Sequence, residues 1–418
     1  MRIAIVGTGI AGLTCAHLLR TRHDITVFER DRRPGGHTNT VSVELDDGTY
    51  SVDTGFIVYN ERNYPGLVRL FARLGIATAP SDMSFSVADE TSGIEWRATS
   101  ATTVFAQRRN ALRPEFVRML TDIARFNRHT RSLHAGGIPD GLTLSQLVAE
   151  QRWSPRLIDW YLAPMVSAIW STPLGDALDI PVATFASFFD NHGLLQRGAQ
   201  PRWRTVASGA RTYVEAILSP LGRRVRLATP VTKILRQNGG IELMTERDGP
   251  EYFDHVILAA HGDQSLALLG DPTPAERAVL GGFRYQPNDV LLHTDSHLLP
   301  RARRAWASWN YRVGDAVVEG GGGATVTYHM NRLQSIESRH QICVTLNQAH
   351  LVDPRTVVRR FRYAHPVLDA AALGAQARHG EINGTRSTWY CGAYWGYGFH
   401  EDGVQSALRV CRAFGADL

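Results

Sequence analysis

Long apolar segments are missing from this sequence. No run approaches the roughly 18 to 20 consecutive apolar residues that a membrane-spanning helix needs, although 44% of the 418 residues are hydrophobic. The first strand-like residues begin at Arg2, so we expect no signal or transit peptide. The composition is that of an ordinary folded enzyme. We expect a cytoplasmic protein, either free in solution or peripheral to the membrane.

Cysteine is scarce, and its pattern excludes the common metal and redox sites. The four cysteines lack CxxC spacing and have small or apolar neighbours: Cys15, Cys343, Cys391 and Cys411. We therefore expect buried thiols. None of the 16 histidines lies in an HExxH-type pattern with an acid beside it. We expect no metal ion.

Lysine is nearly absent, because Lys233 is the only lysine among 45 basic residues. The formal net charge is +5, and we expect no nucleic-acid partner. Much of the positive charge lies in residues 105–134, whose spacing predicts a helix. This segment is either a solvated helix face or a surface that docks on anionic lipid or an acidic partner protein.

The first thirty residues have the pattern of a dinucleotide-binding unit. The apolar run 2–7 ends in GTGIAG, a helical pattern follows, and a second strand is predicted over 24–30. Glu29, followed by Arg30, ends this strand, where a carboxylate accepts hydrogen bonds from ribose hydroxyls. A carboxylate there would repel a 2′-phosphate. The ligand is therefore FAD or NAD rather than NADP.

Each glycine of this turn has a physical role. Gly7 permits the tight turn, Gly9 lets the backbone approach a pyrophosphate, and Gly12 lets the helix pack closely on the strand. The helix N-terminus at Ile10 and Ala11 offers its free N–H groups to the phosphates.

Residues 29–40, ERDRRPGGHTNT, decide between FAD and NAD, because a simple NAD dehydrogenase has no reason for a second glycine pair here. The segment resembles the E-x6-GG-x3-T pattern of the flavin-containing amine oxidase superfamily, which includes monoamine and polyamine oxidases, protoporphyrinogen oxidase and phytoene desaturases. The matching residues are Glu29, Gly35, Gly36 and Thr40. The superfamily usually has arginine where this chain has His37, and a neutral imidazole gives up the charge-assisted phosphate bond. The resemblance implies FAD, with Gly35, Gly36, His37 and Thr38 beside it.

The resemblance continues along the chain. Residues 50–76 are similar to a strand, turn and helix of the superfamily, and the turn lies beside the flavin ring; here it contains Thr54, Gly55 and Phe56. Residues 223–245 and 251–269 are similar to its second FAD segment. In that segment the valine after the first strand, here Val231, contacts adenine through its backbone.

The resemblance implies an α/β fold, α+β overall, with a Rossmann-like FAD-binding domain assembled from discontinuous segments. These segments are 1–80, 205–270 and 375–418. The intervening residues 81–204 and 271–374 then form a substrate-binding domain of helices and an antiparallel sheet. Alternation predicts a hairpin over 84–98, and a glycine turn is expected at 320–323.

Aromatic and large apolar residues are dense in both intervening segments. We take seven of them as candidate substrate contacts: Trp160, Met165, Trp170, Phe188, Trp309, Tyr311 and Tyr328. Any one of them is most simply explained as core. As a set they fit a long apolar tunnel or cavity equally well, because cofactor enzymes line their sites with hydrophobic side chains.

Two absences narrow the chemistry. No second GxGxxG lies in a strand-turn-helix frame, so a flavin here is reduced by substrate rather than by a nicotinamide. Many amine-oxidizing members of the superfamily hold a water near the flavin through a lysine. Lys233 follows the adenine-contacting Val231 and so lies at the wrong end of FAD. The absence of such a lysine favours members that act on carbon chains. In those members the enzyme acts mainly by positioning the substrate C–H bond against the flavin.

The last 30 residues are similar to the superfamily's closing motif, a strand and a glycine turn that lead into a helix aimed at the flavin. Gly392 matches the turn, and Gly403 with Val404 matches the helix start. Ala393 and Tyr394 stand where an acid for the ribityl chain is expected. Glu401 and Asp402 come later, and they either cap the helix or, with His400, form the polar edge of the site. We take four residues as catalytic candidates: Tyr394, Trp395, Tyr397 and His400.

The phrases GFHEDG, TYHMNRLQ and AHPVLDAAALGAQ narrow the resemblance to a bacterial branch of predicted NAD/FAD-binding proteins that accompanies cyclopropane-fatty-acid-synthase-like enzymes. It implies an FAD-dependent oxidoreductase that takes hydride from a lipid or fatty acyl substrate. Three alternatives stay open: a flavin-dependent double-bond isomerase, an amine oxidase, and a flavoprotein subunit that supports a lipid-modifying partner enzyme.

Overall fold

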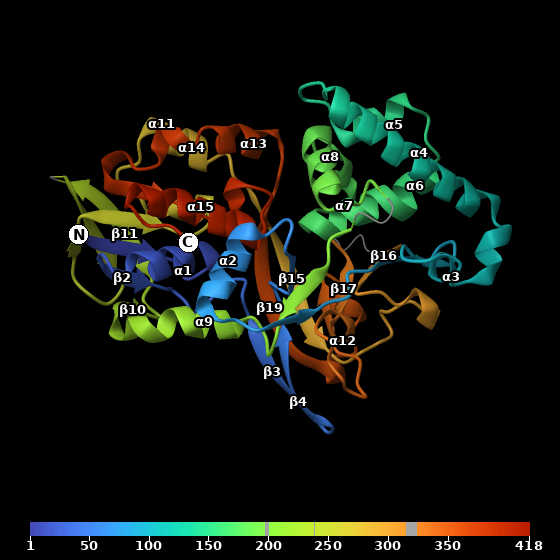
Figure 1. Ribbon diagram of the computed structural model, residues 1–418, viewed down its shortest axis with the longest axis horizontal. Helices are drawn as coiled ribbons and strands as arrows, with labels where there is room; N and C mark the ends of the chain where they lie inside the picture. Colours follow the sequence, from blue (N-terminus) through green and yellow to red (C-terminus); the bar gives the residue numbers. More distant parts are fainter. Residues whose placement is uncertain (197–199, 238, 315–323) are drawn as a thin grey trace.

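The computed structural model of the chain describes residues 1–196, 200–237, 239–314 and 324–418. The glycine turn expected at 320–323 lies outside these residues. Figure 1 shows one lobe that holds both chain termini and a second lobe at the opposite end that holds α3 to α8. Strands β15, β17 and β19 lie between them (Figure 1).

A five-stranded parallel sheet forms the centre of the first lobe. Its order is β10-β2-β1-β14-β20, and all neighbours are parallel. The strands are β1 Arg2–Val6, β2 Asp24–Phe28, β10 Val225–Arg226, β14 His255–Leu258 and β20 Thr388–Tyr390. Ile3, Ile5 and Val27 are fully buried, as expected for parallel strands covered on both faces. These strands come from all three segments expected to bind FAD, although the domain boundaries stay a prediction.

Two layers cover the parallel sheet. The helices α1 Ile10–Leu19, α2 Pro65–Leu74, α9 Arg211–Leu218 and α15 His400–Ala413 share one apolar core with it. A second core joins its other face to a small antiparallel sheet and to further helices. Its strands are β11 Val231–Gln237, β12 Gly240–Thr245 and β13 Glu251–Phe253, and its helices are α10 Gly262–Leu268, α11 Pro274–Leu280, α13 Ala370–Ala377 and α14 His379–Ile382.

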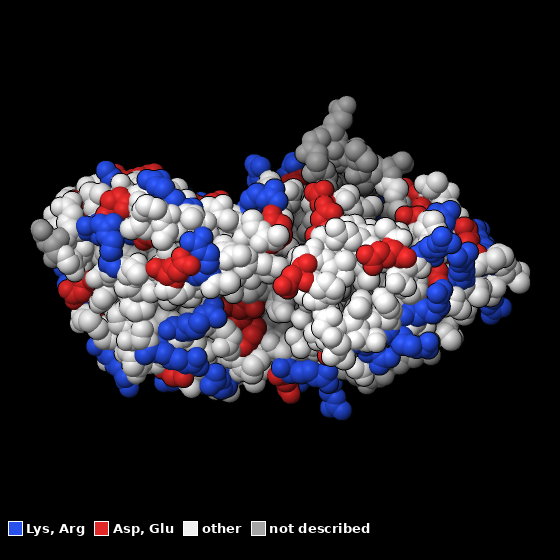
Figure 2. Space-filling view, turned by 90° about the horizontal axis from the view of Figure 1, so that it is seen from above, with Lys and Arg blue, Asp and Glu red and all other residues white. Residues whose placement is uncertain are grey.

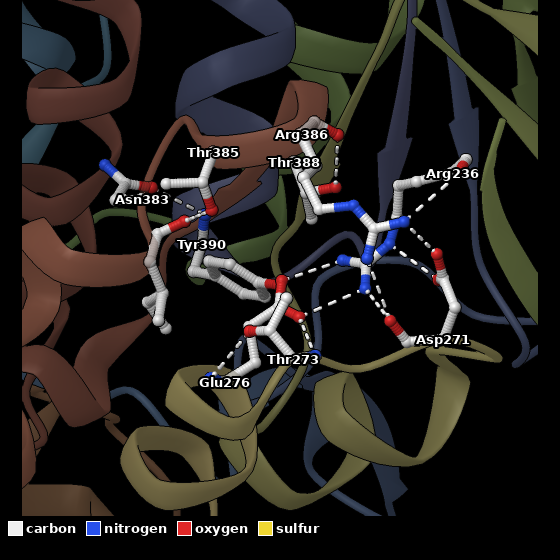
Figure 3. A network of polar contacts seen from close by, with 10 residues as sticks. Arg236, Asp271, Thr273, Glu276, Asn383, Thr385, Arg386, Thr388 and Tyr390 are labelled. Atoms are coloured by element: carbon white, nitrogen blue, oxygen red, sulfur yellow. Dashed lines mark hydrogen bonds and ion pairs between the residues drawn. The ribbon is translucent and has the colours of Figure 1, made fainter. Parts of the chain in front are cut away.

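A buried ion pair joins β11, α11 and β20 (Figure 3). Arg236 donates two hydrogen bonds to the Glu276 carboxylate, at 2.7 and 3.0 Å, and the Tyr390 hydroxyl donates a third at 2.6 Å. Asp271 also accepts from Arg236, at 2.7 Å. Burial alone would raise the pKa of Glu276, but the bonds from Arg236 and Tyr390 lower this pKa to about 2. The network therefore fixes the last strand of the parallel sheet.

The second lobe is built on a seven-stranded sheet of order β19-β15-β18-β17-β16-β7-β8. Only β7 and β16 pair in parallel. The strands are β7 Phe85–Asp89, β8 Ile94–Arg97, β15 Tyr285–His293, β16 Trp309–Val313, β17 Val326–His329, β18 Cys343–Leu346 and β19 Val357–Pro366. The antiparallel pairing of β7 with β8 confirms the hairpin predicted over 84–98.

Helices pack on this sheet in a core rich in aromatic residues. They are α3 Ala101–Val104, α4 Pro114–Gly136, α5 Leu144–Glu150, α6 Pro155–Leu157, α7 Ala163–Trp170, α8 Val182–Asn191 and α12 Met330–Leu333. The helix predicted over 105–134 begins only at Pro114, since proline is tolerated in the first turn of a helix but not in its interior. No helix in the described part of the chain is long and apolar enough to cross a membrane.

Short strands complete the fold. The hairpin β3 Thr40–Leu45 and β4 Gly48–Asp53 packs with the core of the second lobe through Val41, Val43 and Val52. A three-stranded sheet contains β5 Val58–Asn60, β9 Trp203–Val206 and β6 Thr78–Pro80. All four cysteines are free and buried, as predicted.

Candidate functional site

An open cavity of about 2100 Å³ takes its walls from both lobes. Ligand pockets for a single drug-sized molecule usually measure about 300 to 1000 Å³. One end is lined by the GTGIAG turn and the residues after β2, and the other by helices α3, α4 and α7. The cavity therefore has room for a cofactor and a substrate together.

The GTGIAG turn forms a cradle at the N-terminus of α1. A Cβ atom added at Gly12 would lie 2.0 Å from the Gly7 carbonyl oxygen, so only glycine permits this packing. A Cβ at Gly9 would meet nothing within 4 Å, because Gly9 faces the open cavity. A Cβ at Gly36 would lie 3.2 Å from the Gly9 Cα. Bare backbone at the start of a ten-residue helix fits the pyrophosphate of FAD.

Glu29 lies on the cavity wall at the end of β2 and is 9% exposed. Its carboxylate accepts the Thr8 and Asp31 amides, each at 3.0 Å. The Thr8 hydroxyl donates a third hydrogen bond to it. A carboxylate has about four lone-pair sites, so one site is left to accept a hydrogen bond from a ribose hydroxyl. Val231, the expected adenine contact, lines the same end, and Thr229 in its segment donates its amide to the Glu29 carbonyl at 2.8 Å.

Arg33 organises the second glycine pair, a role that the sequence did not reveal. Its guanidinium donates to the carbonyl oxygens of Thr38, at 2.8 Å, and Gly36, at 2.7 Å. The Gly35 amide donates to the Thr8 hydroxyl at 3.1 Å, which ties this loop to the GTGIAG turn. Gly36 lines the cavity, whereas Gly35 lies behind the wall and contributes through its hydrogen bond to Thr8.

His400, the first residue of α15, lies on the cavity wall. Its ring stacks on Phe56 with centroids 3.8 Å apart and planes at 14°. Its Nε2 lies 3.0 Å from the Thr38 hydroxyl and 3.2 Å from the Tyr213 hydroxyl. Burial, with a smaller contribution from His37, lowers the pKa of His400 to about 3. The imidazole is therefore neutral at pH 7, and its ring is held on two sides.

Glu401 and Asp402 cap helices, and neither lies on the described wall of the cavity. The Glu401 carboxylate accepts the Gly66 and Leu67 amides at the start of α2, both at 2.9 Å. Asp402 accepts the Phe399 amide at the start of its own helix, at 2.9 Å. Of the two alternatives for these acids, the geometry favours helix capping, because backbone N–H groups at helix N-termini donate to both of them.

Gly403 and Val404 also lie behind the wall. A Cβ at Gly403 would lie 2.6 Å from the Ile10 side chain, so this glycine lets α15 pack closely on α1. Val404 is fully buried in the same core. Both residues support the cofactor end through packing and do not contact the cavity.

Three further histidines line the cofactor end of the cavity: His37, which was expected there, and His261 and His365, which were not. Burial, and then neighbouring charged groups, lowers the pKa of His37 to about 4 and that of His365 to about 3. The Asn288 amide donates to His365 Nδ1 at 3.0 Å, and Asn347 fixes the orientation of that amide by donating to its oxygen at 2.7 Å. His365 therefore carries its proton on Nε2. His261 lies three residues after the end of β14, and this position was the available signal.

Thr38 and Thr54, which were expected to contact the cofactor, lie behind the cavity wall and hydrogen-bond to its residues or their neighbours. Thr38 bonds Tyr213 and His400, and Thr54 donates to the Asn39 carbonyl at 3.1 Å and contacts the Tyr363 hydroxyl at 2.8 Å. Gly55 and Phe56 do line the cavity. A Cβ at Gly55 would lie 2.1 Å from the His37 carbonyl oxygen, so glycine is required for this close approach.

Three expected substrate or catalytic residues belong to the core instead. Trp160 is fully buried and donates its indole N–H to Asp89 at 2.8 Å, and Tyr311 donates its hydroxyl to Ser167 at 3.0 Å. Trp395 packs on Phe283, with ring centroids 5.0 Å apart. Sequence alone could not separate these aromatic residues from wall residues, because both kinds are apolar and buried.

The other candidates lie on the cavity wall as expected. From the terminal segment these are Gly392, Tyr394, Tyr397 and His400. From the second lobe they are Met165, Trp170, Phe188, Trp309 and Tyr328. Their roles toward cofactor and substrate stay predictions. The one group in the described residues with metal-ligand spacing, Asp46, Asp47 and His340, is not on this wall.

Solved structures share this architecture over the whole chain. A CLA-producing fatty acid isomerase from P. acnes has a TM-score of 0.71 and 18% identity, with 99% of this chain and 98% of that chain covered. Putrescine oxidase has a TM-score of 0.71 and 15% identity, with 99% of both chains covered. Cyclohexylamine oxidase from Brevibacterium oxydans has a TM-score of 0.68 and 15% identity, with 99% and 98% covered. Identities this low show the fold alone.

The family is shown by a sequence match. The family model described as flavin containing amine oxidoreductase matches residues 10–302. This range includes the GTGIAG helix, the Arg33 loop and the adenine-side strands. With a glycine cradle that fits FAD at one end of a large cavity, the chain belongs to the flavin-containing amine oxidoreductase family and is an FAD-dependent oxidoreductase.

Proposed function

We propose that this enzyme takes a hydride from a C–H bond of a hydrophobic acyl-chain substrate. The observation that carries the proposal is the wall of the cavity beyond the cofactor end. It is formed by Phe85, Trp96, Val104, Phe105, Leu120, Ile123, Met165, Ile169, Trp170 and Phe188, among others. Such a wall binds an alkyl chain by removing its surface from water, at about 25 cal/mol per Å².

FAD, when bound, supplies the acceptor for the hydride. One C–H bond of the substrate breaks and its electron pair leaves with the hydrogen, a proton leaves the adjacent carbon, and a C=C bond forms. The imidazole of His400 is our candidate to hold that proton. Burial lowers its pKa to about 3, so it takes the proton only where negative charge develops beside it, because such charge raises the pKa of an imidazole. Thr38 and Tyr213 orient its Nε2. The apolar wall excludes water from the reacting carbons.

The charges on the wall do not favour an amine. An amine arrives as a cation, and an unpaired carboxylate on the wall would attract it. In the described wall, Glu29 and Asp31 lie at the cofactor end, and Asp82 is paired with Arg332 at 2.9 Å. Lys233, the only lysine, lies on β11 and not on this wall.

A double-bond isomerase is the second candidate. The similarity in fold to the fatty acid isomerase, over 99% of this chain, supports it. In this reaction the hydride returns to another carbon of the same acyl chain. One double bond then moves, and the cofactor ends in its oxidised form.

Anaerobic spectroscopy with oleate, linoleate, putrescine and cyclohexylamine separates these functions. A desaturase loses its flavin absorbance when an acyl substrate is added. An isomerase keeps the flavin oxidised at steady state while the double bond of linoleate moves, as detected by gas chromatography. Reduction by the amines alone would overturn the proposal in favour of amine oxidation. Conversion of an acyl chain by the purified protein would exclude a purely supporting role beside a partner enzyme.

A further inference from the structure

One face of α4 changes from apolar to charged along the cavity. Leu120, Ile123, Ala124, Asn127 and Arg131 line the cavity from this helix. Their spacing of three and four residues places them on a single helix face. From Leu120 to Arg131 this face extends about 16 Å along the helix axis. This face is apolar at Leu120, Ile123 and Ala124 and becomes polar at Asn127 and Arg131. Its polarity therefore matches a ligand with an alkyl chain and an anionic head group.

Arg131 is the available charge at this end of the cavity. Five of the seven Asp, Glu and Arg residues on the described wall lie just after β2 or on β19: Glu29, Arg30, Asp31, Arg33 and Arg362. That leaves Asp82, which is paired with Arg332, and Arg131. No carboxylate in the described residues lies within 4.0 Å of the Arg131 guanidinium, and Arg131 is exposed. Its position is therefore a mouth of the cavity.

The neighbouring arginines of α4 are engaged or point elsewhere. Arg118 and Arg125 contact Asp122 at 3.8 and 3.0 Å, and Arg125 also lies over the Trp153 ring. Arg128 is exposed but does not line the cavity. Figure 2 shows arginines gathered over the end of the molecule that carries α3, α4 and α5. Arg131 differs from them because the cavity reaches it.

We propose that Arg131, with Asn127 beside it, binds the carboxylate of a free long-chain acid whose alkyl chain lies along Ile123 and Leu120. A guanidinium matches a carboxylate with two parallel hydrogen bonds, and this pairing is stronger than a neutral one. The Asn127 amide nitrogen lies 3.5 Å from the Leu194 carbonyl and also contacts the Tyr161 hydroxyl, so Arg131 supplies the charge that recognises the head group and Asn127 supplies a polar neighbour. This inference rests on the proposed acyl-chain function and names the head group of its substrate.

The test compares oleate with methyl oleate, which keeps the chain and removes the charge. Binding is followed under anaerobic conditions by the change in flavin absorbance of the FAD-loaded enzyme. Arg131→Gln should weaken oleate binding about five- to tenfold and leave methyl oleate unchanged. Arg128→Gln, one turn away on the same helix, should change neither. High salt should weaken oleate binding to the wild type and not to Arg131→Gln, because salt screens an exposed charge pair.

Reversing the charge sharpens the test. Arg131→Glu should bind oleate more weakly than Arg131→Gln does, and it should bind oleylamine more tightly than the wild type does. Equal binding of oleate and methyl oleate by the wild type, with no effect of Arg131→Gln, would overturn the head-group site while leaving an acyl substrate in place. Failure of the wild type to bind either lipid would instead contradict the proposed function itself. Unchanged FAD content of the variants confirms that they are folded.

Discussion

The two ends of the cavity are built in different ways. The cofactor end is made largely of backbone: the GTGIAG turn, the Arg33 loop and Gly55 approach one another so closely that a Cβ would collide at Gly12 and Gly55. The other end is made of side chains on α3, α4 and α7, where only the size and polarity of each residue matter. A backbone surface is tied to particular glycines, whereas a side-chain surface tolerates many sequences.

The two ends also differ in their polar groups. Buried neutral histidines surround the cofactor end, and hydrogen bonds to hydroxyls or amides hold His400 and His365. The far end is mainly apolar and aromatic and leads to Arg131. Chemistry and cofactor binding therefore depend on the first end, and the choice of substrate depends on the second.

The largest effect is expected at the cradle. Gly9→Val should abolish FAD retention and leave the fold intact, because its side chain fills space that is open in the protein but needed by the pyrophosphate. Gly12→Ala should destabilise the fold as well, since its Cβ would lie 2.0 Å from the Gly7 carbonyl oxygen. Flavin absorbance and thermal unfolding measure the two effects. A yellow, fully loaded Gly9→Val protein would refute the assignment of the cradle.

Acid should destabilise the protein, in part through four histidines at the cofactor end. The folded pKa values of His37, His261, His365 and His400 are lowered to about 4, 4, 3 and 3 from 6.5. Between about pH 6.5 and 4 the unfolded chain therefore binds more protons than the folded one, and stability falls with pH. Each histidine adds a slope of up to about 1.4 kcal/mol per pH unit.

The acid effect is measured as the free energy of unfolding and the FAD release at pH 7, 6 and 5. His365→Gln should reduce the slope of unfolding free energy against pH by the contribution of one histidine, up to about 1.4 kcal/mol per pH unit. A pH-independent stability over this range would contradict the neutral state of the cluster.

The ion pair behind the cofactor end should matter more than a surface pair. Glu276→Ala removes the fully buried carboxylate partner of Arg236, leaves the partly exposed Asp271 as the remaining one, and should cost up to about 3 to 5 kcal/mol of unfolding free energy. Glu381→Ala breaks the exposed pair with Arg378 and should cost much less, because water screens this pair. Urea unfolding measures both, and equal losses would show that Glu276 is not the tie between β11, α11 and β20.

The effect expected at His400 is on the rate of reduction and not on stability. His400→Ala should slow flavin reduction by oleate about ten- to hundredfold and change FAD affinity much less, because His400 faces the reacting end but does not form the cradle. Tyr213→Phe removes one partner of Nε2 and should have a smaller effect in the same direction. Stopped-flow reduction at the wild-type rate would exclude a catalytic role for His400.

Sequence could predict the features that local geometry requires. The GTGIAG turn, the strands around it and the hairpin of β7 and β8 lie where their residues indicate. It could not assign Glu401 and Asp402, because both are acids at a helix start and only the packing of α2 against α15 gives Glu401 the amides of another helix. It also missed His365, whose tautomer depends on Asn288 in β15 and on Asn347 just after β18, both far from it in the sequence.

The sequence by itself determined the cofactor cradle, since glycine is the residue that permits positive φ and backbone contact without a side chain, and such positions are visible one residue at a time. Only the tertiary structure decided which aromatic residues form the core, such as Trp160 and Tyr311, and which form the wall, such as Met165 and Trp309. The reason is that burial drives all of them inward alike, and the empty space beside a buried side chain depends on how distant segments pack.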